Sequence, residues 1–174
     1  MSSCERRSRW GDWRLTALLL ALPLGGCFQP LYGEAFHPGL AAEMRAIAIA
    51  PIGNRIGHYL GDDLSAELNG TGETPEPKYR LTVTLTVGVG TPTVTSQLQV
   101  ANASTETGYA TFTLTPAGGG AALVTGQAVT SAVYDRTEDR FANLRAQRDA
   151  DIRIAKTLAH EIQLRLAAFL GEKK

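Results

Sequence analysis

The stretch YRLTVTLTV, residues 79–87, alternates apolar side chains with arginine or threonine along its whole length. Successive side chains of a strand point to opposite faces, so this period of two predicts a β-strand. The apolar set begins with Tyr79 and Leu81, and the polar set begins with Arg80 and Thr82. We therefore expect the apolar face to pack on helices and the threonine face to remain open.

Strand signals also lie on both sides of this stretch. Residues 44–52, MRAIAIAPI, predict a first strand with Ile47 and Ile49 on one face. Glycines and a proline in residues 88–92 predict the end of the central strand. Further strands are predicted over residues 93–100, 109–115 and 123–134. The run PAGGG, residues 116–120, predicts the turn of a hairpin.

Two segments have helical spacing. Apolar residues recur every three or four positions over residues 55–68, and again over the longer run 141–170. The element order is therefore strand, helix, three or so strands and a final helix. Helices that cover one face of a sheet are the simplest packing of this order. We predict an α+β fold, a two-layer α/β sandwich with two long helices on one face of a mixed sheet of about four strands.

Residues 1–26 have the form of a secretory signal peptide. Basic residues precede a short apolar run, Leu15 to Leu24, and Gly25 and Gly26 precede Cys27. The apolar run is about half of the roughly 20 residues that a membrane-spanning helix needs, which favours cleavage over an uncleaved anchor. A cysteine at the first mature position is typical of bacterial lipoproteins. Cys27 is therefore the predicted lipid anchor, carrying diacylglycerol and an N-acyl chain.

These features divide the chain into a signal peptide (1–26), a lipidated tether (27–43) and one α/β sandwich domain (44–174). The tether contains Phe28, Leu31 and Tyr32, which a purely flexible spacer would lack. We expect these three side chains to pack either on the domain's own core or on a partner near the membrane.

Composition excludes several classes of function. After removal of residues 1–26 the chain keeps 13 basic and 15 acidic residues, so no basic excess indicates nucleic acid binding. Cys4 leaves with the signal peptide and Cys27 carries lipid, so no thiol remains for a disulfide, a metal or catalysis.

The sequence contains no convincing catalytic or metal-binding set. His37 and His160 are isolated from any cluster with ligand spacing, and His58 with Asp62 is read as an exposed helical pair. The glycines at residues 88–90 precede a threonine and a proline and not a helix, so they predict no phosphate-binding loop. We expect no catalytic residues, no metal, no cofactor beyond the covalent lipid, and no enzymatic activity.

Several runs together are typical of one family. They are Cys27-Phe28-Gln29-Pro30-Leu31-Tyr32-Gly33, Tyr79-Arg80-Leu81 at the start of a threonine-rich strand, Tyr134-Asp135 in the return strand, and Arg148-Asp149-Ala150 with Leu158-Ala159 in the final helix. In this order they resemble LptE, the lipopolysaccharide-assembly lipoprotein family, in its α-proteobacterial form. The resemblance covers nearly all of the mature chain, although the glycine that usually follows the family's lipidated cysteine is absent.

The resemblance implies a role in assembly and not a reaction. Members of the family are partners of the outer-membrane β-barrel translocon LptD, in whose lumen they act as a plug, and they bind lipopolysaccharide. The implied partners are LptD, lipopolysaccharide and the membrane that holds the lipid anchor. The implied location is the outer membrane, with the domain facing the periplasm or inside the barrel lumen. Phe28, in place of the aspartate that favours inner-membrane retention, fits this location.

Basic residues are candidates for contact with the phosphates of such a lipid. Lys78 and Arg80 open the central strand, and we expect them to contact lipopolysaccharide or the barrel wall. Arg136 and Arg140 flank the start of the last helix. The alternative for all four is an ordinary surface charge. Phe28, Leu31 and Tyr32 are the candidates for docking on the barrel.

A free-standing lipid-binding accessory lipoprotein of an envelope transport system is the alternative function. A plug needs a broad polar surface, whereas a carrier needs a concave apolar pocket. The open threonine face of the central strand favours the plug.

Overall fold

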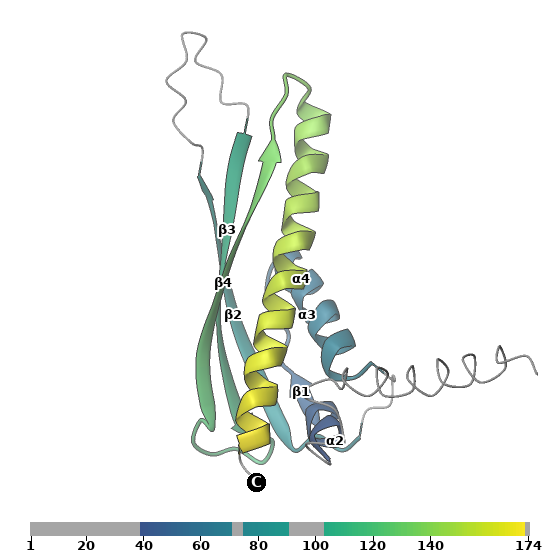
Figure 1. Cartoon of the computed structure of the whole chain (residues 1–174), viewed down its shortest axis with the longest axis vertical. Coiled ribbons are helices and arrows are strands. Elements are labelled where there is room, and N and C mark those ends of the chain that lie inside the picture. Colours follow the sequence, from purple (N-terminus) through teal and green to yellow (C-terminus); the bar gives the residue numbers. More distant parts are fainter. Residues whose placement is uncertain (1–38, 71–74, 91–102, 173–174) are drawn as a thin grey trace, which may run out of the picture.

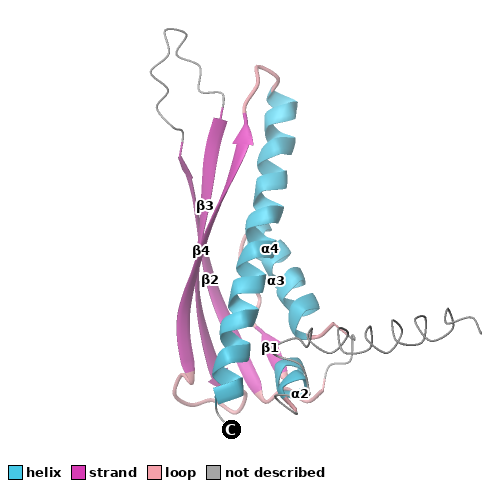
Figure 2. Cartoon of the chain, in the orientation of Figure 1, coloured by secondary structure: helices cyan, strands magenta, loops and turns pink. Residues whose placement is uncertain are grey.

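The computed structural model describes residues 39–70, 75–90 and 103–172. In these ranges a helix, a strand and a second helix precede three strands and one long helix (Figures 1 and 2). The elements are α2 (Leu40–Arg45), β1 (Ile47–Ile49), α3 (Arg55–Leu68), β2 (Tyr79–Gly90), β3 (Ala103–Pro116), β4 (Val124–Asp135) and α4 (Arg140–Glu172).

The four strands form one sheet in the order β1-β2-β3-β4. β1 pairs parallel to β2, and the other two pairs are antiparallel, so the sheet is mixed. β2 and β3 remain in register from Tyr79 opposite Pro116 to Gly90 opposite Thr105. The long helices α3 and α4 lie on the same side of the sheet (Figure 1). The predicted sandwich, with two long helices on one face of a mixed four-strand sheet, is confirmed.

Helix α4 covers most of the length of the sheet. Its 33 residues span about 50 Å at roughly 1.5 Å per residue, and the 14 residues of β3 span about the same at roughly 3.4 Å per residue. Its buried residues recur at helical spacing from Ala150 to Leu170 and include Ile154, Leu158 and Ile162. Residues 140–149 contribute no buried side chain. The sandwich is therefore closed along most of its length and less tightly packed at the end where α4 begins.

Two glycines allow this close packing. A Cβ atom at Gly108 of β3 would lie 2.6 Å from Ile154 Cγ2 and 3.2 Å from Leu158 Cδ1, both on α4. A Cβ atom at Gly126 of β4 would lie 2.4 Å from Cζ of the Phe112 ring. Phe112 and Gly126 are cross-strand partners, so the ring covers the position that a side chain would occupy.

The predicted boundaries are wrong in three places. The strand predicted over residues 44–52 is only Ile47–Ile49, because Met44 belongs to α2, where Leu40 and Met44 share one face and are both buried. The strand 79–87 continues to Gly90, since β3 supplies a paired neighbour as far as Thr105. The strand predicted from residue 109 begins at Ala103.

The other boundaries agree with the prediction or fall outside the described chain. Helix α3 spans Arg55–Leu68 as predicted, and the return strand and the final helix differ from the prediction by one or two residues at their ends. The strand predicted over residues 93–100 lies outside the described residues. Within the described ranges, no helix has an apolar stretch long enough to cross a membrane.

Candidate functional site

The face of the sheet turned away from the helices is polar and exposed. Alternation places the even-numbered residues of β2 and the odd-numbered residues of β3 and β4 on this surface, which we call the threonine face. Its exposed polar members are Arg80, Thr82, Thr84, Thr86, Thr111, Thr125, Gln127, Ser131 and Asp135. The opposite face carries buried residues such as Leu81, Phe112 and Leu114. The predicted division of β2 into a packed face and an open face is confirmed.

A small apolar area interrupts the threonine face near its centre. Tyr109 of β3 is 52% exposed, and its cross-strand partner Val129 on β4 is 49% exposed. Thr86 lies opposite Tyr109 on β2. An aromatic ring amid hydroxyl groups combines apolar contact area with a polar handle, which suits contact with a protein surface.

Lys78 and Arg80 lie at the end of the sheet where β2 begins. Both are exposed, and Arg80 belongs to the threonine face as predicted. The main chain of Lys78 is held on both sides, because its N–H donates to the Ala46 carbonyl and its carbonyl accepts from the Ala117 N–H, each at 2.8 Å. Arg80 lies opposite Thr115 of β3. The fold thus holds the backbone of this pair firmly and leaves the two cationic side chains in solvent.

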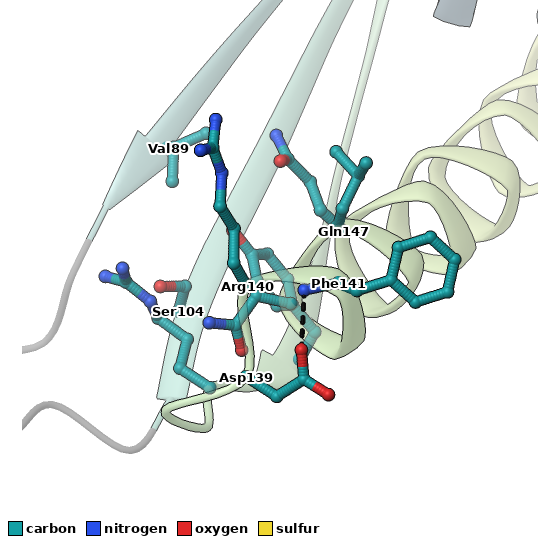
Figure 3. Close-up of a pocket in the computed structure, with 10 residues that line it drawn as sticks. Val89, Ser104, Asp139, Arg140, Phe141 and Gln147 are labelled. Atoms are coloured by element: carbon teal, nitrogen blue, oxygen red, sulfur yellow. Dashed lines mark hydrogen bonds between the residues drawn. The ribbon is translucent and has the colours of Figure 1, made fainter.

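A groove opens at the other end of the sandwich, where α4 begins (Figure 3). Its volume is about 870 Å³. β2, β3, β4 and the first turns of α4 all contribute to it, so it is assembled from four separate parts of the chain. The lining residues are Val89, Ser104, Tyr134, Arg136, Asp139, Arg140, Phe141, Asn143, Leu144 and Gln147. We call it the terminal groove.

Hydrogen bonds hold the start of α4 in place beside the terminal groove. The Asp139 carboxylate accepts from the Phe141 N–H at 2.8 Å, as a helix-capping side chain does. The Asn143 side chain accepts from the Thr137 N–H at 2.7 Å and donates to the Thr137 carbonyl at 2.8 Å. The loop before α4 is therefore tied to the first turns of the helix, and this fixes the backbone that carries Arg136 and Arg140.

The terminal groove combines apolar walls with cations. Val89, Phe141 and Leu144 are all more than half exposed, and apolar side chains grouped in this way are typical of a surface that binds a ligand or a partner. Arg136 and Arg140 lie among them. Apolar walls beside guanidinium groups suit an amphipathic molecule that carries an anionic group.

The terminal groove brings together Arg136 and Arg140, two candidate basic residues, but its presence does not follow from the sequence. Val89 and Phe141 are 52 positions apart in the chain, and no local pattern connects them. Helical spacing placed Phe141 and Leu144 on the apolar stripe of the last helix, but in the structure they are 63% and 57% exposed, because the packed part of α4 begins only at Ala150.

A buried pair of carboxyl groups lies between the terminal groove and the core. Glu106 of β3 is 2% exposed and Asp151 of α4 is 0% exposed. A guanidinium nitrogen of Arg55, from α3, donates to Asp151 Oδ2 at 2.7 Å. Burial, then the charge of Asp151 and a hydrogen bond with it, raise the pKa of Glu106 to about 7, against smaller opposing effects of Gln147 and Arg55. Sequence periodicity alone predicts neither acid to be buried.

The remaining predicted site residues fall into two groups. Cys27, Phe28, Leu31 and Tyr32 lie outside the described residues. His58 Nε2 lies 3.7 Å from Asp62 Oδ2 on α3, and both side chains are largely exposed. The predicted exposed helical pair is therefore confirmed. Among residues 39–70, 75–90 and 103–172, no group of three or more histidine, cysteine or acidic residues is placed to hold a metal ion.

Comparison with known proteins places this fold among lipoproteins. No family model and no curated protein matches the sequence. A candidate lipoprotein from Caulobacter crescentus CB15 superposes with a TM-score of 0.62 at 25% identity, over 79% of this chain and 98% of that one. A minor lipoprotein from Acinetobacter baumannii superposes with a TM-score of 0.52 at 11% identity, over 70% and 90%. The rare lipoprotein B of Shewanella oneidensis matches with a TM-score of 0.45 at 9% identity, over 73% and 94%.

The first two superpositions show that this chain shares its overall fold with solved lipoproteins of two bacteria.

Proposed function

We propose that this chain is a lipopolysaccharide-assembly lipoprotein. In this role it is the plug and assembly partner of the outer-membrane β-barrel translocon LptD, and it takes part in the transport and insertion of lipopolysaccharide into the outer membrane. The role is one of binding and assembly, without catalysis or a resident metal. It extends to this chain what the family resemblance implies, and the lipoprotein nature of its structural neighbours supports it.

The threonine face is the observation that carries this proposal. The lumen of a large outer-membrane barrel is polar and holds water, so a plug inside it needs a broad polar surface. Threonine hydroxyls on an exposed sheet can bond to water or to lumen side chains without a desolvated charge. The exposed row Thr84, Thr111 and Gln127 lies at the centre of this surface.

The lipid anchor completes the proposed arrangement. Residues 1–26 are removed, Cys27 carries the lipid in the outer membrane, and the tether that follows leads into the domain, of which α2 with its buried Leu40 is already a part. Phe28, Leu31 and Tyr32 dock on the barrel close to the membrane interface, where the amphipathic side chain of Tyr32 is favoured. Lys78 and Arg80 contact the barrel wall from the edge of the threonine face.

Purification of the tagged full chain from detergent-solubilised outer membranes tests the plug role. The expected result is a stoichiometric large β-barrel that co-purifies with the chain and is identified by mass. Thr111→Arg places a long cation at the centre of the threonine face, and we expect it to lower the recovered barrel by at least fivefold. Thr157→Arg places the same side chain on the exposed side of α4, and the barrel is expected to remain. A wild-type chain that purifies without a barrel would overturn the proposal.

The terminal groove favours a second candidate function, a free-standing lipid-binding accessory lipoprotein. Its volume of about 870 Å³ lies within the usual range for ligand pockets, and it offers both an apolar wall and two arginines. In this function the chain would bind an amphipathic anion without a barrel, and the threonine face would have no partner.

Charge reversal at each end of the sheet tests whether lipopolysaccharide binds in the terminal groove and the barrel binds at the threonine face. Arg136→Glu with Arg140→Glu is expected to weaken binding of purified lipopolysaccharide by at least tenfold, because each charge-assisted bond to phosphate contributes about 1.5–3 kcal/mol. Lys78→Glu with Arg80→Glu is expected to lower barrel recovery and to leave lipopolysaccharide binding within about threefold, since this pair lies about 30 Å from the groove at roughly 3.4 Å per residue. Titration of the detergent-solubilised chain with labelled lipopolysaccharide gives the affinities. An equal loss of lipopolysaccharide affinity in both double variants would contradict a lipid site in the groove.

A further inference from the structure

The buried carboxyl pair lies at the point where the packed core meets the terminal groove. Asp151 follows Ala150, the first buried residue of α4, and Gln147, one turn earlier, lines the groove. On β3 the inward-facing residues run from Ser104, which lines the groove, to Glu106 and then to Gly108, against which Ile154 packs. The two acids therefore separate an apolar core from an open cavity.

The hydrogen bonding of this pair is incomplete. Glu106 Oε2 and Asp151 Oδ1 are both buried, and with both groups ionised neither oxygen has a hydrogen-bond partner, whereas a proton on Glu106 allows the hydrogen bond with Asp151. The remaining carboxylate oxygen of Asp151, Oδ2, accepts from Arg55 at 2.7 Å, and the Arg55 side chain is 56% exposed. One partly solvated cation thus faces two buried acids. An uncompensated buried charge is costly, so the pair is most stable when it holds a proton.

The charged and titratable groups around the pair account for its behaviour. Arg55 faces both acids from α3, beside Tyr59, and Gln147 and Asp151 face Glu106 from α4. Arg148 of α4 donates to the Tyr59 hydroxyl at 3.0 Å. On the sheet, the neighbours opposite Glu106 are Val89 on β2 and Ala132 on β4, which carry no charge. With one proton on Glu106, the set of Glu106, Asp151 and Arg55 is neutral, and without it the set carries one buried negative charge.

We propose that Glu106, Asp151 and Arg55 form a proton-dependent latch, which holds the first part of α4, residues 140–149, against the sheet while the pair keeps its proton and releases it when the proton is lost. The terminal groove lies between this segment of α4 and the sheet. Loss of the proton therefore widens the groove, and gain of the proton narrows it. Because residues 140–149 contribute no buried side chain, little apolar packing opposes this release.

The direction of the pH effect follows from the raised pKa of Glu106, about 7 in the folded chain against an ordinary 4.5. Between these values the folded chain holds a proton that the unfolded chain has lost, so raising the pH favours unfolding. Below both values the stability contribution of Glu106 is fully present, and above pH 7 it has been lost. One proton changes the equilibrium between the closed and the open latch by up to tenfold per pH unit, so the ratio of closed to open latch is expected to fall by about a hundredfold across this window.

Hydrogen exchange of the detergent-solubilised full chain at pH 5 and pH 8, corrected for the intrinsic exchange rate, tests the latch. We expect amide protection in residues 140–149 to fall by at least tenfold at pH 8, with a smaller change in residues 158–167. Glu106→Gln keeps the shape of the side chain without a titrating proton and is expected to remove the pH dependence of residues 140–149. An equal change in both segments, or an unchanged pH dependence in Glu106→Gln, would overturn the latch.

Two further variants keep the test decisive if Glu106→Gln does not fold. Arg55→Gln alters a half-exposed side chain, and without the cation the pair carries a buried negative charge even with one proton, so the opening of residues 140–149 is expected to move to lower pH. Asp63→Asn is the matched control, because burial also raises the pKa of Asp63 but that residue lies on α3 and not in the latch. It is expected to leave the exchange of residues 140–149 unchanged. An Arg55→Gln chain that opens at the same pH as the wild type would exclude the latch.

Discussion

Phe112→Ala is expected to lower the free energy of unfolding by about 3–5 kcal/mol, the usual loss when a buried phenylalanine is truncated. Phe112 is 1% exposed, and its ring covers Gly126 on the neighbouring strand. Gly126 on β4 has no side chain that could fill the cavity left by the ring. β4 or α4 would therefore have to move to close it. Urea unfolding followed by circular dichroism measures the loss. It would be a large part of the stability of an ordinary domain, about 5–15 kcal/mol.

Tyr109→Ala is the matched control for Phe112→Ala. Tyr109 is an aromatic residue three positions earlier on the same strand, but it lies on the threonine face and is 52% exposed. We expect a loss of less than about 1 kcal/mol. Gly126→Ala adds a second check, because its Cβ would lie 2.4 Å from the Phe112 ring in the wild type and would meet no ring in the Phe112→Ala chain. If the losses in unfolding free energy from Phe112→Ala and Gly126→Ala simply added in the double variant, the packing of the Phe112 ring over Gly126 would be wrong.

Gly108→Val is the second substitution with a large expected effect. Its Cβ alone would lie 2.6 Å from Ile154 Cγ2, a branched and stiff side chain, so α4 would have to move away from β3. Overpacking of this kind lowers stability by about 1–3 kcal/mol and occasionally by more. We expect Gly108→Val to lower stability by an amount at the upper end of this range or beyond it, because valine adds two further carbons to the contact with Ile154. The midpoint of urea unfolding is the measurement.

Gly88→Val is the control for Gly108→Val within the same sheet. Gly88 is on β2, and a Cβ atom there would meet nothing within 4 Å. Valine suits a strand, so stability is expected to change by no more than about 0.5–1 kcal/mol in either direction. Ile154→Ala in the Gly108→Val background is expected to recover part of the lost stability. If Gly108→Val were as stable as the wild type, the close approach of α4 to β3 would be wrong.

The threonine face, the terminal groove and the buried carboxyl pair differ in position and in chemistry. The threonine face is broad and polar, and we propose that it meets the barrel. The terminal groove is concave, partly apolar and cationic, and it suits an amphipathic anion. The buried Glu106 and Asp151 lie between the groove and the core, and they link the groove's width to pH. Variants of the threonine face are therefore expected to leave the groove and the carboxyl pair intact, whereas variants of the pair are expected to change the groove.

Local patterns predicted the elements of this chain because each element obeys its own period. The two-residue alternation from Tyr79 predicted which face of β2 is buried, and Leu81 and Val83 are buried as predicted. The three- and four-residue spacing of apolar residues predicted α3 and α4 to within one or two residues. Lys78 and Arg80 lie where the alternation placed them, on exposed positions at the start of β2. These features depend on neighbours within a few positions, which a sequence shows directly.

The failures share a different physical cause. Met44 looks like part of a strand, but it pairs with Leu40 on one turn of α2 to cover the core, and long-range packing overrides the local preference there. Gly88 and Gly90 look like a strand end, but β3 provides hydrogen-bonding partners that extend β2 through them. Propensity is a weak guide wherever tertiary partners supply more free energy than the local choice.

The sequence by itself determined the α+β sandwich, its two long helices and its open threonine face, and it predicted the lipid anchor at Cys27. Only the tertiary structure decided the terminal groove and the burial of Glu106 beside Asp151. The groove needs Val89, Arg136 and Phe141 to meet from separate elements, and the buried pair needs β3 to face α4. Such meetings depend on strand register and on the position of α4 over the sheet. Both arise from the packing of the whole core, which no short stretch of residues encodes.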